Sequence, residues 1–329
     1  MEHESKKRGP MKRALHLLGL AVAIAAFAYF VLYAYRALAG QDLSQLLQPR
    51  VMLAGALLTG LYALLVSLTA VAWSWLLRGL GQPAAFTVTG PILATTQMGK
   101  YLPGNVAHHF GRVVVARGHG LDTGRTVLSM AYETLLVLVA CAHVSALTFL
   151  WSPPAALAQW PLAQYRAPLV VAISCGALAI MLAAPRIAGM ITRLRAGQGA
   201  PAAAAVRGHP GWFTSLGCYL VYSLNFALVG VGLWAVAKSL SPDPVGAASL
   251  VLLVGAFASS WILGFLAPGA PAGLGIREAV LSLWLGSTFG ATIAVALIVM
   301  LRIATTLGDL LNFLWGSAAL ARGRRLRLQ

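Results

Sequence analysis

The sequence predicts an all-α, polytopic membrane protein with about eight spanning segments, and three observations support this prediction. Hydrophobic residues make up 59% of the 329 residues and charged residues only 10%, whereas soluble domains carry about 25% charged residues. Several apolar runs reach the roughly 20 residues that a spanning helix requires. None of these runs shows the alternating pattern of a membrane β-barrel strand.

The distribution of basic residues predicts the orientation of the chain. Lys and Arg number 24 against 8 Asp and Glu, which gives a net charge of +16. Such an excess is also typical of nucleic-acid-binding proteins, but here the cations lie in short loops beside apolar runs, which is the positive-inside pattern. We therefore expect membrane lipids with anionic headgroups as partners and no nucleic acid. Both termini are expected on the cytoplasmic side of a bacterial inner membrane.

The first half of the membrane domain is predicted over residues 14–184, after a basic cytoplasmic N-terminus at 1–13. Its first apolar run, 14–39, follows five basic residues and so resembles a secretory signal. The run continues for more than 20 residues, however, which favours an uncleaved first span over a cleaved signal. Further spans are expected at 51–77, 125–151 and 168–184.

A re-entrant hairpin is expected at 84–118, between the second and third spans. Its two apolar segments, 84–98 and 106–118, are too short to cross the membrane comfortably and are separated by a break at 100–105. Basic residues follow the hairpin, so it is expected to enter and leave on the cytoplasmic face. Non-helical backbone at membrane depth is tolerated only where protein or a water-filled cavity surrounds it. The break is therefore predicted to line a cavity.

The second half of the membrane domain is predicted over residues 211–321, after a basic, Ala- and Gly-rich cytoplasmic linker at 185–210 and before a basic cytoplasmic tail at 322–329. Its expected elements are spans at 212–236 and 291–320 and, between them, a broken hairpin at 245–288 with apolar helices at 245–267 and 276–285 around a break at 268–275.

The two hairpins resemble each other in sequence. The stretch QMGKYLPGNVAHHFGR at 97–112 and the stretch LAPGAPAGLGIRE at 266–278 both carry Pro-Gly, followed by an Arg at the same offset. Paired Gly/Pro interruptions in the two halves of a transporter point to a binding site near the bilayer midplane. The predicted topology gives the halves opposite orientations, so an inverted repeat is expected.

Several charged residues are predicted to lie deep in the membrane. Lys100 and Arg277 lie at or beside the two breaks, where a charge costs about 2.5–3.5 kcal/mol and usually marks a substrate or ion path. The structural alternative is that each pairs with a carboxylate such as Glu133 or Glu278. Each break also precedes a helix N-terminus, whose free N–H groups and positive dipole end attract anions.

Two other polar groups are candidates for a role in the site. Arg302 and Asp309 are seven residues apart on one face of the last span, where they form either a network that holds the bundle or a functional pair. His108 and His109 are adjacent, so on a helix they point about 100° apart and do not chelate one metal together. Each is interpreted as a headgroup or proton ligand, or as a satisfied interfacial histidine.

No metal, cofactor or disulfide is predicted. Cys141, Cys175 and Cys218 lie within or at the edge of apolar runs and lack metal-ligand spacing. They are expected to be small buried hydrophobic residues.

The motif KYLPGN followed by Arg112, Glu133 in the next span, and PAGLGIRE in the second half together resemble the lysylphosphatidylglycerol synthase transmembrane-region family, also called flippase-like domain proteins. The resemblance covers about residues 14–320. The family is similar to the flippase part of the multiple peptide resistance factors, and this sequence shows no synthase domain, so aminoacyl transfer is not implied. The first motif often carries an aromatic residue where this chain has Ala107 and His108. Residues that match the family motifs are Lys100, Tyr101, Pro103, Gly104, Asn105, Arg112, Gly273, Gly275, Arg277 and Glu278.

Three functions follow as hypotheses. The first is a flippase that moves an anionic or zwitterionic lipid headgroup, with cations at the breaks binding the phosphate and glutamates countering an amine or coupling to protons. The second is an intramembrane lipid-modifying enzyme that uses a polyprenyl carrier, and the third is a scaffold for a lipid-biosynthesis enzyme, for example of hopanoids. We expect the first, a non-enzymatic transporter, as a monomer or homo-oligomer. The candidate substrate-binding residues are Lys100, Tyr101, Gly104, Asn105, His108, Arg112, Glu133, Gly275, Arg277, Glu278, Arg302 and Asp309.

Overall fold

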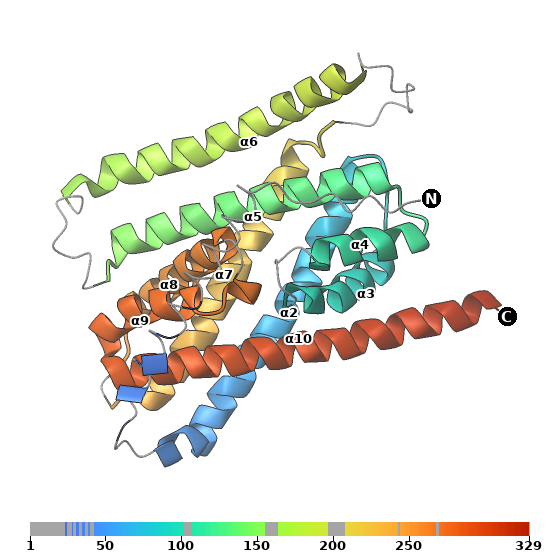
Figure 1. Cartoon of the computed structure of the whole chain (residues 1–329). Coiled ribbons are helices and arrows are strands. Elements are labelled where there is room, and N and C mark those ends of the chain that lie inside the picture. The colour runs from blue at the N-terminus through green and yellow to red at the C-terminus, as the bar shows by residue number, and fades with distance from the viewer. Residues whose placement is uncertain are drawn as a thin grey trace.

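The structure is a computed structural model in which every regular element is a helix (Figure 1). It describes residues 24, 28, 31–32, 35–36, 39, 43–101, 107–154, 164–196, 208–242, 244–267 and 270–328. No strand occurs among these residues, so the predicted all-α class is confirmed. The predicted N-terminus at 1–13 and most of the predicted span at 14–39 lie outside the described residues.

Six helices in the described part of the chain are long and apolar enough to cross a membrane. They indicate a multi-pass membrane protein, whereas the predicted total of about eight spans stays a prediction. The six helices are α2 (Pro49–Gly79), α5 (Thr123–Trp151), α6 (Arg166–Ala196), α7 (Trp212–Leu240), α8 (Ala247–Leu266) and α10 (Ala291–Leu328). The shorter elements are η1 (Leu43–Leu47), α3 (Phe86–Thr96), η2 (Gln97–Tyr101), α4 (Ala107–Gly118), η5 (Pro271–Gly273) and α9 (Ile276–Phe289).

Local sequence signals account for several helix ends. Pro49 begins α2, where its missing N–H costs no hydrogen bond. Asp122 caps α5, because its side chain accepts a hydrogen bond of 2.8 Å from the backbone N–H of Arg125. Gly290 ends α9 with a φ of 78°, a conformation that glycine adopts without a steric penalty.

Two helices continue beyond the predicted ends of their spans. The predicted linker at 185–210 is helical as far as Ala196, because α6 does not end at 184. The predicted tail at 322–329 continues α10 as far as Leu328. Hydropathy marks where a helix leaves the apolar part of the membrane, but Ala, Arg and Leu are strong helix formers that carry the helix further.

The peripheral position of α6 corrects one prediction about the cysteines. Cys141 and Cys218 are buried as expected, but Cys175 is exposed. It lies on α6, whose main contacts are with α5 alone (Figure 1). A cysteine in an apolar run is therefore not necessarily inside the bundle, because one side of a peripheral helix faces away from it.

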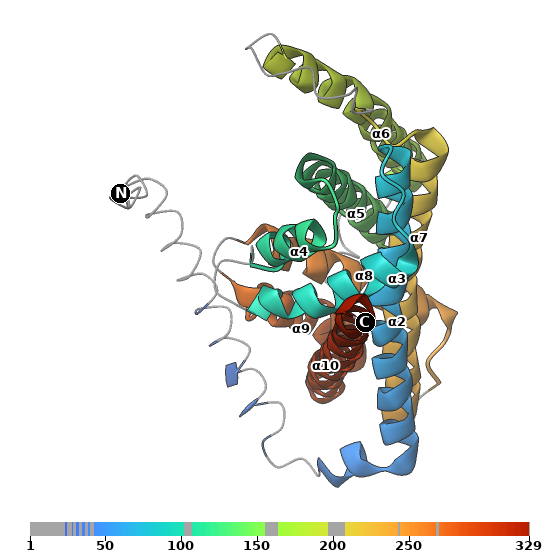
Figure 2. The ribbon, with the colours of Figure 1, turned by 90° about the vertical axis from the view of Figure 1, so that its right-hand side faces the viewer.

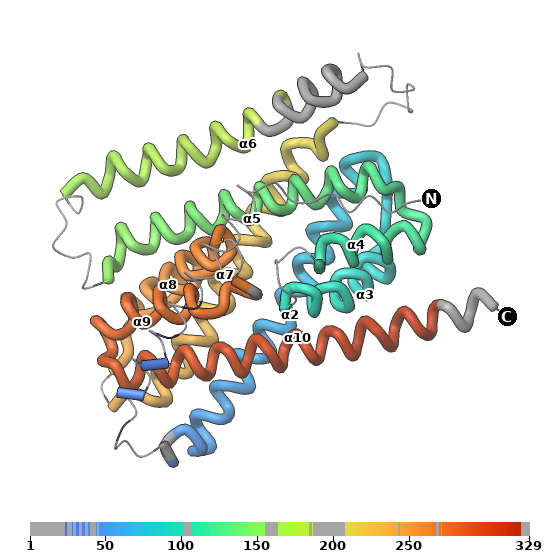
Figure 3. The backbone as a smooth tube through the Cα atoms, in the orientation of Figure 1, coloured from blue at the N-terminus to red at the C-terminus, as the bar shows by residue number. Residues whose placement is uncertain are grey.

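The helix contacts of the first half recur in the second half. Helices α2 and α7 lie side by side along one side of the bundle (Figure 2). Around them, α3 packs against α10 and α8 packs against α5, and each of the short helices α4 and α9 contacts the long helix that follows it (Figure 3). Exchanging α2 with α7, α3 with α8, α4 with α9 and α5 with α10 reproduces the same set of helix contacts. Only α6 has no counterpart among the described helices.

Glycines allow the central helices to approach closely. A Cβ at Gly230 of α7 would lie 2.2 Å from Val254 Cγ2 of α8, and one at Gly232 would lie 2.5 Å from Leu58 Cδ1 of α2. Close backbone contacts of this kind are typical of helix packing in membranes. They show that α7 packs tightly against both α2 and α8.

Candidate functional site

A cavity of about 200 Å³ is lined by residues from both of the segments that were predicted to form hairpins. Residues of η2 and α4 from the first hairpin and of α8, η5 and α9 from the second contribute to its wall, together with residues of α2, α5 and α7. The 3₁₀ turns η2 and η5 also contact each other. Among the described residues, four Lys, Arg or Glu side chains line the cavity: Lys100, Arg112, Glu133 and Arg277. The described parts of the two predicted motifs therefore meet at one site.

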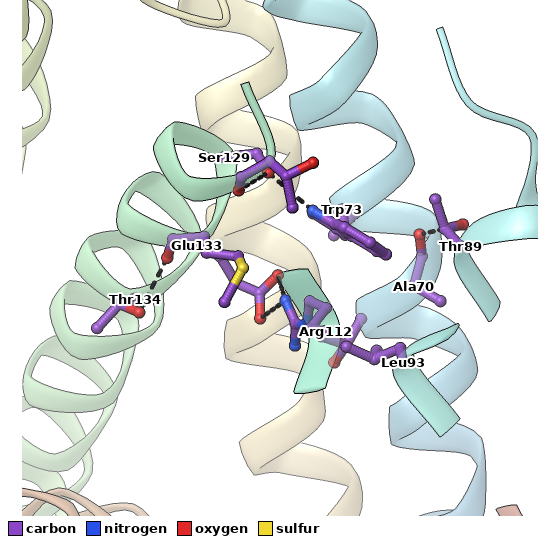
Figure 4. Close-up of polar contacts among 12 residues, drawn as sticks. Ala70, Trp73, Thr89, Leu93, Arg112, Ser129, Glu133 and Thr134 are labelled. Carbon is purple, nitrogen blue, oxygen red and sulfur yellow. Dashed lines mark hydrogen bonds and ion pairs between the residues drawn. The ribbon is translucent and has the colours of Figure 1, made fainter. Parts of the chain in front are cut away.

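Arg112 and Glu133 form a buried ion pair that joins α4 to α5 (Figure 4). The Arg112 Nη1 donates to both carboxylate oxygens of Glu133, at 2.9 and 2.8 Å. The guanidinium lies 5.0 Å from the ring centroid of Trp73 on α2, and Trp73 Nε1 donates to Ser129 Oγ at 2.8 Å. Arg112 and Glu133 are only 3% and 8% exposed, so each depends on the other to compensate its charge.

Lys100 and Asp309 form a second ion pair, which joins η2 to α10. The Lys100 Nζ lies 2.6 Å from Asp309 Oδ2 and donates to the hydroxyl of Tyr62 at 3.0 Å. The hydroxyl of Tyr101 donates to the same carboxylate oxygen at 2.6 Å. Of these predicted site residues, Asp309 pairs with Lys100 and Tyr101 donates to Asp309. Neither of the two lines the cavity.

Arg302 and Glu278 form a third ion pair, which joins α10 to α9. Arg302 also donates to the backbone oxygen of Gly273 in η5 at 3.5 Å. Arg302 and Asp309 were predicted on one face of one helix, and each pairs with a different hairpin. Lys100 does pair with a carboxylate, as the structural alternative expected, but with Asp309 and not with Glu133 or Glu278. Arg277 forms an ion pair with neither glutamate. Adjacent helical side chains such as those of Arg277 and Glu278 point in different directions, and Glu278 faces α10.

Among the described cations in and next to the cavity wall, Arg277 alone has no carboxylate partner. No carboxylate of the described residues lies within 4.0 Å of its guanidinium, and its Nε has no hydrogen-bond partner. The guanidinium lies 5.9 Å from the ring centroid of Trp261. Two glycines make room for the side chain, because a Cβ at Gly264 or Gly273 would lie 2.6 or 2.7 Å from its atoms. The side chain of Arg277 is thus closely surrounded by its neighbours, and it lines the cavity.

The remaining predicted residues differ in what the structure says of them. His108 and His109 both line the cavity with their ring centroids 3.9 Å apart, and His108 Nδ1 is buried without a partner. Gly275 caps the N-terminus of α9 with a φ of 83°. Gly104 and Asn105 lie outside the described residues. Within the described part of the chain, no group of three metal-ligating side chains occurs.

Several residues of the site were not predicted from the sequence. Tyr62, Trp73 and Trp261 contact the deep cations through a hydroxyl or an aromatic face. In an apolar run, an aromatic residue has no feature that separates such a role from ordinary packing. Asn225 of α7 donates to Thr69 Oγ1 of α2 at 3.1 Å and so links the two helices. It also lines the cavity.

These features define the class of the protein as a multi-pass helical membrane protein with a cavity lined by charged side chains between its helices. Compared with known proteins, the chain matches no family model and no curated protein at a significant level. The resemblance to the lysylphosphatidylglycerol synthase transmembrane-region family therefore stays a prediction.

Proposed function

We propose that this chain is a lipid flippase, which binds the headgroup of a phospholipid or lipid-linked substrate in the cavity and moves it across a bacterial inner membrane. The observation that carries this proposal is Arg277, a cation on the cavity wall that no carboxylate of the described residues compensates. A charge at membrane depth usually marks a substrate path. An anionic headgroup would supply the missing counter-charge.

The symmetric helix contacts support a transport mechanism. An inverted repeat with interrupted helices at its centre allows one half to rock against the other around a fixed site, which opens the site to each side in turn. The exchange of α2–α5 with α7–α10 leaves the helix contacts unchanged, as such a repeat requires. We therefore propose that α3–α4 and α8–α9 are two re-entrant or broken hairpins of opposite orientation.

The three ion pairs favour transport over the two other hypotheses. An intramembrane transferase needs a carboxylate available to the bound substrate, but Glu133 is held by Arg112 and Glu278 by Arg302. A scaffold would leave every deep charge paired and no cavity between the hairpins. Arg277 and the cavity that it lines fit neither description.

The first prediction concerns the charge of Arg277. In proteoliposomes with headgroup-labelled phospholipids of different charge, Arg277→Ala should lower the rate of leaflet exchange at least about tenfold. The reason is that it removes the cation that binds the anionic headgroup. Lys238→Ala is the matched control. Lys238 also lies over an indole, 4.5 Å from the ring of Trp234, but it does not line the cavity. Wild-type exchange in folded Arg277→Ala protein would refute the proposal.

A second prediction concerns the position of Arg277. In Gly264→Ala, the new Cβ would lie 2.6 Å from Arg277 Cγ and 2.9 Å from Nε, so the arginine must shift. We expect exchange to fall several-fold, since a displaced charge binds the headgroup less well. Gly60→Ala is the control, because nothing lies within 4 Å of that new Cβ. Equal exchange rates in the two variants would show that the position of Arg277 does not matter.

A further inference from the structure

The balance of charge around the cavity identifies a substrate class. We infer that the cavity selects a lipid headgroup with one negative charge, a phosphodiester, over a zwitterionic headgroup and over a phosphomonoester or pyrophosphate. This inference rests on the proposed function, because it names the substrate of the same site.

The deep charges of the described residues sum to a single uncompensated positive charge. Four cations and three carboxylates lie in or directly behind the cavity wall, and every carboxylate is paired with a cation other than Arg277. Residues 102–106 and 268–269, which connect the described parts of the two hairpins, contain no ionisable side chain. They therefore leave the sum of charges unchanged.

The comparison of the two halves shows how this single charge arises. Glu133 lies ten residues after the first residue of α5 and compensates Arg112 of the preceding hairpin. On α10, the charged residue at nearly the same place is Arg302, which lies eleven residues after the first and pairs with Glu278. The second half thus has a cation, Arg302, at the helix position where the first half has Glu133, the carboxylate that compensates Arg112. For Arg277, a bound anionic ligand would supply the negative charge that α10 does not.

A zwitterionic headgroup finds no unpaired carboxylate for its amine among the described residues that line this cavity. Glu133 is the only carboxylate among the described lining residues, and both of its oxygens accept from Arg112. The aromatic side chains Phe226, Phe257 and Phe265 also line the cavity. They offer an ammonium group only a cation–π contact and no counter-charge, and the indole of Trp261 already lies against Arg277.

A doubly charged headgroup is disfavoured for the opposite reason. One of its charges would be compensated by Arg277. His108 and His109 also line the cavity but are neutral at about pH 8, so the second charge would require Lys100 or Arg112 to leave its carboxylate. Either exchange breaks an ion pair whose carboxylate is at least nine-tenths buried and leaves that carboxylate without a counter-charge. Only a dianionic headgroup incurs the free-energy cost of breaking an ion pair, so the cavity should bind a monoanionic headgroup more tightly than a dianionic one.

The test is direct binding to the purified full-length chain in an uncharged detergent, measured by titration calorimetry at about pH 8, where a phosphomonoester carries about two charges. The probes are dihexanoyl phosphatidylglycerol, dihexanoyl phosphatidylcholine and dihexanoyl phosphatidic acid. We expect the phosphatidylglycerol to bind at least about tenfold more tightly than either of the others. Arg277→Gln should remove its advantage over the phosphatidylcholine, and Arg277→Lys should retain it. Lys238→Gln should behave as the wild type.

The outcomes separate this inference from the proposed function. Equal affinities, tighter binding of phosphatidylcholine or phosphatidic acid, or no binding of any probe would overturn the inference, even if proteoliposomes showed lipid exchange that depends on Arg277. A preference for phosphatidylglycerol that persists in Arg277→Gln would overturn it as well. A preference that depends on Arg277, in protein that exchanges no lipid, would uphold the charge selectivity and refute the flippase.

Discussion

Glu133→Ala is expected to destabilise the folded protein by about 3–5 kcal/mol, because it leaves a buried arginine without its counter-charge. Arg112 is 3% exposed, and its guanidinium donates two hydrogen bonds to Glu133. The measurement is the free energy of unfolding in mixed micelles, obtained from a denaturant titration. Arg125→Ala is the control, because Arg125 makes an exposed hydrogen bond to the Gly81 oxygen and should change stability by less than about 0.5 kcal/mol.

The double variant Arg112→Leu/Glu133→Leu distinguishes the ion pair from simple packing. Replacing both members of a buried ion pair with apolar residues is often neutral or stabilising, whereas removing one member is not. We therefore expect the double variant to recover most of the stability that Glu133→Leu loses. If its loss equalled the sum of the two single losses, the two charges would not be coupled.

Gly230→Ala is expected to cost about 3 kcal/mol of stability, at the upper end of the range for overpacking. The new Cβ would lie 2.2 Å from Val254 Cγ2 and 2.9 Å from its Cα, so α8 itself must move away from α7. Thermal unfolding in detergent measures the effect. Gly60→Ala, which meets nothing within 4 Å, should be neutral or slightly stabilising. A neutral Gly230→Ala would mean that α7 and α8 separate without cost.

The sequence predicted those features that depend on local chemistry. Apolar runs gave the positions of α2, α5, α7 and α8 to within a few residues, because the length of an apolar run reflects the thickness of the membrane. The interruptions beside Lys100 and at Gly275 followed from Pro and Gly, which disfavour a continuous helix. The deep charges were recognisable because their insertion is costly.

The partners of those charges were not predictable from the sequence. Lys100 and Asp309 are 209 positions apart, and only the packing of η2 against α10 brings them together. Arg302 and Asp309 share a helix, yet one pairs with α9 and the other with η2. Which carboxylate compensates which cation depends on the side of each helix that faces a neighbour, and that is a property of the fold.

The role proposed for Arg277 was also not predictable from the sequence, because it depends on the lack of a carboxylate partner among the described residues. Its sequence neighbour Glu278 would predict a local pair, but that carboxylate contacts Arg302. The space for the arginine comes from Gly264, thirteen positions earlier on α8. Glycine in so Gly-rich a chain, with 34 of 329 residues, carries little information until its neighbours are known.

The packing of α3 against α10 and of α8 against α5 has a consequence for how the chain is built. Helix α5 of the first half packs against α8 of the second half, and α10 of the second half packs against α3 of the first half. The two halves are therefore interlocked, and neither half alone supplies all the contacts of its own short helices. A chain synthesised as far as α6 still lacks the helix that packs against α3, so the packing of the first half is completed only when α10 is in place.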